Sequence, residues 1–244
     1  MSNDQKWIKL EKRIPVFHFI PFVDFVLVAG SMALGTAKPE SDFDVIVGAR
    51  YGRIFTVRFL AVLLFGALGW RANHKNNNVA DKICLNHFVT SKSYCLAPLE
   101  TERALTVRAP PYNEYWRNLY KNLIPIYGGK QAIEKFFLDN AGWVGGVGAR
   151  DYSRLNSGKS FNSNHKNLIP RVLSISTFVN STMEFLLNRK FGDFIELLLK
   201  KLQIWKIKKS IRAGLGYKPR IRYCDEELEF HPDTKRTEFE LTSI

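Results

Sequence analysis

The chain has 244 residues, 45% of them hydrophobic and 24% charged, which is ordinary for a globular protein and sufficient for one large or two small domains. Its formal net charge of +13 favours an anionic partner such as a nucleotide, RNA, DNA or a membrane surface. Three cysteines without metal-ligand spacing indicate free thiols in a reducing compartment, and charges throughout residues 1–15 predict no signal peptide. We therefore expect a cytoplasmic protein.

The first predicted elements lead to a polar turn between two apolar strands. Residues 7–22 form a short amphipathic element that Pro15 interrupts, and an apolar strand follows at 23–29. Residues 30–41 contain turn-forming glycine, proline and serine, and a second strand is expected at 43–47.

An apolar segment at 54–70 is the one stretch with the appearance of a membrane span. It is short for a span and contains Arg58, so we predict a helix packed on a sheet and no membrane span. An asparagine-rich surface loop at 71–82 and a third strand at 83–89 come next.

The second half of the chain is predicted to be mostly helical. We expect a helix at 99–108 and then a junction at Pro110-Pro111, which divides the chain into domains at 1–110 and 111–244. The expected features of the second domain are helices at 114–128 and 131–144, a flexible loop near 145–167, a helical stretch at 171–212 broken at Gly192, a hairpin or extended arm after 216, and a frayed tail.

The most informative motif lies in the turn between the first two strands. Gly30-Ser31 is followed, after residues 32–41, by Asp42-Phe43-Asp44. Two carboxylates one residue apart on a strand point to the same face, about 7 Å apart, and repel each other unless a hard divalent cation binds between them. The Gly-Ser turn offers backbone N–H groups and a hydroxyl that suit a phosphate. The pattern therefore predicts chemistry on a nucleoside triphosphate.

The segment GSMALGTAKPESDFDVIV resembles the signature of the DNA polymerase β-like nucleotidyltransferase superfamily, in particular its small bacterial and archaeal members. The strong resemblance covers residues 30–47 and extends over about the first hundred residues. It implies an α/β fold with a nucleotidyltransferase-type mixed sheet, followed here by a helical C-terminal domain. It also implies that Asp42 and Asp44 hold Mg²⁺ or Mn²⁺ and act in catalysis, and that Gly30 and Ser31 bind the triphosphate.

The third carboxylate that this superfamily usually carries on a neighbouring strand is not evident here. The corresponding strand reads DKICLNHFV, and we align Asn86 with the missing acid as a third metal ligand. An asparagine ligates through its carbonyl oxygen but cannot act as a base at neutral pH. His87 and Asp81 are the alternatives for the third group.

Two functions remain open at this point. The first is a metal-dependent nucleotidyltransferase that transfers a nucleoside monophosphate from a triphosphate to an acceptor that the sequence does not identify, with RNA and a small molecule as candidates. The second is a catalytically weakened nucleotide- or RNA-binding regulatory protein, which the absence of an acid at Asn86 favours.

Overall fold

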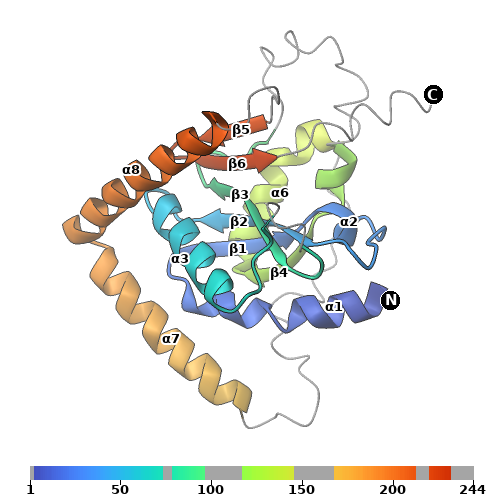
Figure 1. The fold of residues 1–244 in the computed structure, drawn as a ribbon, viewed down its shortest axis with the longest axis horizontal. Helices are drawn as coiled ribbons and strands as arrows, with labels where there is room; N and C mark the ends of the chain where they lie inside the picture. The colour runs from blue at the N-terminus through green and yellow to red at the C-terminus, as the bar shows by residue number, and fades with distance from the viewer. Residues whose placement is uncertain (1–2, 74–78, 97–116, 146–167, 213–219, 232–244) are drawn as a thin grey trace.

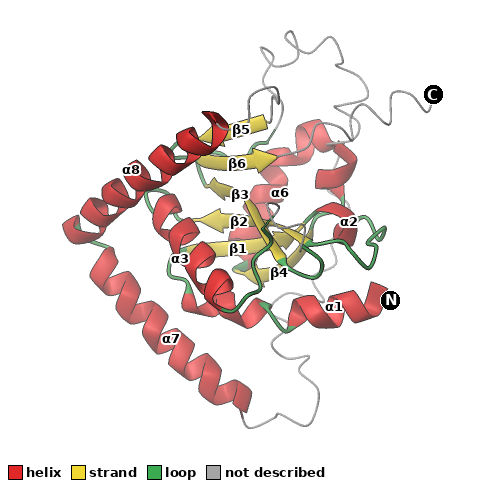
Figure 2. Cartoon of the chain, viewed as in Figure 1, coloured by secondary structure: helices red, strands yellow, loops and turns green. Residues whose placement is uncertain are grey.

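A mixed six-stranded β-sheet forms the centre of the computed structural model, with strand order β4–β1–β2–β3–β6–β5 (Figures 1 and 2). The structure describes residues 3–73, 79–96, 117–145, 168–212 and 220–231. Among the described strand pairs, β2 and β3 are parallel and the other neighbours within the sheet are antiparallel. The strands are β1 (Val23–Val28), β2 (Phe43–Ala49), β3 (Ile83–Thr90), β4 (Ile124–Gly128), β5 (Arg220–Tyr223) and β6 (Glu227–His231).

Both faces of the sheet are covered, as the alternation of apolar side chains along β1 shows. Val26 and Val28 belong to a core shared with α3 (Ile54–Ala67), whereas Phe25 and Leu27 belong to a second core shared with α6 (Lys130–Val144). A strand with apolar residues on both faces is expected for a sheet between two helical layers. The chain is therefore an α/β protein.

The other labelled helices pack around the core that contains α3. They are α1 (Asn3–Glu11), the 3₁₀ helix η1 (Ile14–Phe19), the single turn α2 (Gly30–Ala33), α7 (Leu168–Leu187) and α8 (Lys190–Arg212). In Figure 1, α7 and α8 lie along one side of the molecule, with α8 beside α3. Among the residues that the structure describes, no helix is both long and apolar enough to cross a bilayer.

Most of the predicted elements are confirmed. The strands expected at 23–29, 43–47 and 83–89 correspond to β1, β2 and β3, and the apolar segment 54–70 is the helix α3 packed on the sheet. The helix expected at 131–144 is α6, and of the region after 216 the described residues 220–231 form the hairpin β5–β6. The helix expected at 99–108, the loop at 146–167 and the tail after 231 lie outside the described residues.

The helix predicted over 114–128 is wrong for its second half. Within the described residues the helix covers 117–121, and the chain then forms β4. Pro125 cannot supply a backbone donor, so it is unfavourable in a helix interior but acceptable in a strand at the edge of a sheet, which is where β4 lies. Three strands that follow residue 110 thus join the sheet, while the proposed domain boundary itself falls outside the described residues.

Candidate functional site

Backbone hydrogen bonds hold Asp42 beside the start of β3. The N–H of Asp81 donates to the carbonyl oxygen of Ser41 at 3.0 Å, and the N–H of Phe43 donates to the carbonyl oxygen of Lys82 at 2.8 Å. These two bonds flank Asp42, which directly precedes β2. The Lys6 ammonium also donates to the Ser41 carbonyl at 2.6 Å, so α1 supports the same loop.

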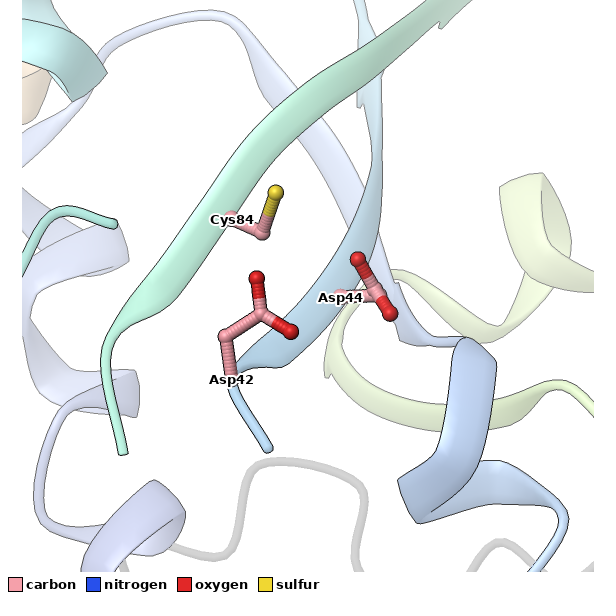
Figure 3. Close-up of side chains that lie close together, drawn as sticks. All are labelled: Asp42, Asp44 and Cys84. Atoms are coloured by element: carbon pink, nitrogen blue, oxygen red, sulfur yellow. The ribbon is translucent and has the colours of Figure 1, made fainter. Parts of the chain in front are cut away.

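Cys84 completes a cluster with the two aspartates. In the parallel pairing of β2 and β3, Asp44 lies opposite Cys84, and one ligand atom from each of Asp42, Asp44 and Cys84 lies within 4.8 Å of the others. Figure 3 shows the three side chains gathered between the two strands. Cys84 is buried, whereas both aspartates are partly exposed, so solvent reaches the carboxylate side of the cluster.

The environment of Cys84 favours its neutral thiol. Burial raises the pKa of the thiol well above its ordinary value, and the nearby carboxylates of Asp44 and Asp42 raise it further by charge repulsion and by hydrogen bonding. A neutral thiol can donate its S–H to a carboxylate but is a poor ligand for a hard cation. The oxygen atoms of Asp42 and Asp44 are therefore the natural ligands for Mg²⁺ or Mn²⁺ at this site.

Gly30 lies directly against the carboxylate of Asp44. The N–H of Ala29 donates to the Asp44 carbonyl oxygen at 2.9 Å, and Gly30, with a φ of 60°, begins the turn α2. A Cβ atom at Gly30 would overlap the Asp44 side chain. Both the positive φ and the close approach therefore require glycine. Of the predicted phosphate-binding pair, Gly30 is thus beside the carboxylates, and Ser31 follows it in α2.

Asn86, the predicted third ligand, lies at an irregularity of the strand pairing. Asp44 pairs with Cys84, but Ile46 pairs with His87, so β3 contains one extra residue between these two points. The register places Cys84, not Asn86, opposite Asp44. Ligation by Asn86 stays a prediction. Cys84 lies two residues before Asn86, so on a regular strand the two side chains would share a face. A search of that face for metal-ligating residue types would therefore have found Cys84.

The two alternatives for the third group have other partners. The His87 ring nitrogen Nε2 lies 3.0 Å from the Glu227 carboxylate. These two side chains form a second buried cluster with Glu229. Arg222 also pairs with Glu227, at 2.9 Å. Asp81 accepts hydrogen bonds from Lys6 and Lys9, which lower its pKa even though burial opposes that shift. Sequence reasoning considered His87 but missed its glutamate partners, which β6 brings from the far end of the chain.

Comparison of the chain with protein-family models, with curated proteins and with solved structures finds no match. The residues of the site are therefore the basis for the function proposed below.

Proposed function

We propose that the chain is a metal-dependent nucleotidyltransferase that transfers a nucleoside monophosphate from a nucleoside triphosphate to an acceptor hydroxyl or phosphate and releases pyrophosphate. The observation that carries the proposal is the convergence of Asp42 with Asp44, whose carboxylate lies directly against Gly30. The nucleotidyltransferase-type arrangement of the sheet belongs to the same proposal. It is supported by two adjacent strands that carry the turn and the carboxylates, as the resemblance of residues 30–47 implies.

Each residue of the site has a separate role in this proposal. Gly30 lets the backbone approach the triphosphate, and Ser31 contributes its N–H and hydroxyl as hydrogen-bond donors. Asp42 and Asp44 hold Mg²⁺ or Mn²⁺, and the bound cation neutralises charge on the triphosphate. RNA and a small molecule are the candidate acceptors. By analogy with other transferases built on this scaffold, the helical part of the chain shapes the acceptor site.

A catalytically weakened nucleotide- or RNA-binding regulatory protein is the second candidate. The observation that favours it is Cys84, because a buried neutral thiol stands opposite Asp44. A raised pKa keeps the thiol protonated at neutral pH, so it has no free position for a further proton and does not replace a carboxylate as a general base. Such a protein would bind a metal–nucleotide complex without releasing pyrophosphate.

Pyrophosphate release by the full chain separates these functions. The protein is incubated with Mg²⁺ or Mn²⁺ and each of the four ribonucleoside triphosphates, with and without RNA. We expect metal-dependent release of pyrophosphate. In Asp44→Asn the rate of release should fall at least about 100-fold, because this change removes the negative charge of a metal-ligating carboxylate. Glu40→Gln is the matched control, since Glu40 is exposed in the preceding loop, and it should retain full activity.

Calorimetry with the same triphosphates reports binding independently of turnover. Binding that requires the metal and disappears in the double variant Asp42→Asn/Asp44→Asn, without pyrophosphate release under any condition, would assign the regulatory function. Equally tight binding in the presence of a chelator would contradict both functions.

A further inference from the structure

The outer sides of α7 and α8 carry an unusual concentration of exposed apolar side chains. Phe178 on α7 is 72% exposed, and Phe194 and Trp205 on α8 are 62% and 64% exposed. Single exposed apolar residues are common on protein surfaces, but a contiguous set on one side marks an interaction surface. We call this set the outer face; its members are Ile175, Phe178, Val179, Phe185, Leu186, Phe191, Phe194, Leu197, Leu198, Leu202 and Trp205.

The opposite sides of the same helices already pack on the protein. Glu184 of α7 accepts hydrogen bonds from the N–H of Phe22 and from Arg50, both at 3.1 Å. On α8, Glu196 bonds to the first turn of α3, and the buried Gln203 donates to the carbonyl oxygen of Phe55 at 2.8 Å. Both helices are therefore docked on the protein through their inner sides.

The outer face of α8 is a continuous stripe with helical spacing. Phe191, Phe194, Leu198, Leu202 and Trp205 follow one another at intervals of three and four residues, which places them along one side of a helix. This side is opposite Gln203 and the other inward-facing residues. Along α7 the outer face is uncharged from Ile175 to Leu186, because the one acid in that range, Glu184, is engaged on the inner side.

The charges beside the stripe are nearly all positive. Lys201, Lys206, Lys208 and Lys209 are exposed on α8. The only two acids of this helix are engaged elsewhere: Asp193 pairs with Arg53 at 2.7 Å, and Glu196 bonds to α3. An apolar aromatic stripe flanked by lysines is typical of helices that lie in the interface of an anionic bilayer.

We propose that the outer face of α7 and α8 binds the surface of an anionic lipid bilayer, with the helices lying in the plane of the interface. Phenylalanine, tryptophan and leucine side chains enter the boundary of the acyl chains, and the lysines contact the anionic headgroups. A second copy of the chain fits less well, because the flanking lysines make the outer face positively charged and two copies would bring faces of like charge together. This inference is independent of the proposed nucleotidyl transfer.

Sedimentation of the full chain with lipid vesicles tests the proposal. We expect the protein to pellet with vesicles of phosphatidylcholine and phosphatidylglycerol, to bind at least about tenfold more weakly to phosphatidylcholine alone, and to dissociate as salt is raised. The triple variant Phe191→Ser/Phe194→Ser/Trp205→Ser should weaken binding at least about tenfold, since three apolar contacts are lost. The control is Leu138→Ser on α6, which is equally exposed at 65% but lies over the other face of the sheet and should bind normally.

A second variant set tests the charges without altering the apolar stripe. Lys201→Gln/Lys208→Gln/Lys209→Gln should lose the preference for anionic vesicles. Absence of binding to both vesicle types, or equal binding to both by the parent chain, would overturn the proposal. So would a lipid-independent dimer in sedimentation velocity that the triple serine variant dissociates, because that result would assign the outer face to a second copy.

Discussion

At the scale of single residues, the site depends on a glycine that touches a carboxylate. Gly30 and Gly35 both have a positive φ, 60° and 70°, but only Gly30 faces Asp44; a Cβ at Gly35 would meet nothing within 4 Å. A side chain at Gly35 would therefore meet backbone strain alone, whereas one at Gly30 would meet the same strain and also collide with Asp44. Few pairs of residues so close in sequence offer such a comparison.

We predict that Gly30→Ala abolishes metal-dependent triphosphate binding, whereas Gly35→Ala preserves it. Both variants should lose about 1 kcal/mol of stability from the strained φ, and Gly30→Ala should lose more because its Cβ displaces the Asp44 carboxylate. Calorimetry with a triphosphate and Mg²⁺, together with urea unfolding, measures both effects. Equal nucleotide affinity in the two variants would show that the position of Asp44 against Gly30 is not needed for binding.

At the scale of elements, the pairing of β2 with β3 determines which side chain joins the two aspartates. The extra residue in β3 shifts the register, so that Cys84 lies opposite Asp44 and Asn86 lies at the irregularity. A β-bulge of this kind changes which side chains share a face. The two positions can be compared by placing a carboxylate at each in turn.

We predict that Cys84→Asp responds to metal more strongly than Asn86→Asp. A carboxylate at the buried position 84, beside the partly exposed Asp42 and Asp44, should lower the melting temperature of the metal-free protein by repulsion, and Mg²⁺ should restore it by neutralising that charge. Cys84→Ser, which adds no charge, serves as the control. Melting curves with and without Mg²⁺ provide the measurement, and a larger metal response in Asn86→Asp would establish Asn86 as the third ligand position.

At the scale of the whole molecule, local patterns predicted the central elements and the carboxylates but not their distant partners. Mainly apolar runs predicted β1, β2 and β3, and the period of two along a strand predicted that Asp42 and Asp44 share a face. In the segment of β4 the apolar spacing also fits a helix, and only the edge of the sheet makes Pro125 acceptable there. The opposition of Cys84 to Asp44 depends on a strand register, which no local pattern contains.

The contact between α8 and α3 is the clearest case of such distant pairing. The residue before α3 is Arg53, whose side chain does not cap the helix, so the first N–H groups of α3 lack a local acceptor. Glu196 supplies one: its carboxylate accepts from the N–H of Phe55 at 2.9 Å, from the N–H of Thr56 at 2.8 Å and from the Thr56 hydroxyl at 2.6 Å. This side chain lies 140 residues from Thr56 along the chain. A negative charge at a helix N-terminus is favourable, so the contact both caps α3 and docks α8.

We predict that Glu196→Ala lowers the free energy of unfolding by about 2–3 kcal/mol, because it leaves two backbone donors of α3 without their charged acceptor. Glu134→Ala is the matched control: Glu134 is an exposed acid on α6 that pairs with Lys130, and its loss should cost less than about 0.5 kcal/mol. Urea unfolding measures the stabilities, and hydrogen exchange should show faster exchange of the Phe55 and Thr56 amides in Glu196→Ala alone. If those amides keep their protection and stability is unchanged, α8 is held on α3 by its apolar contacts and by Gln203, and the capping interaction contributes nothing to the assembly of the fold.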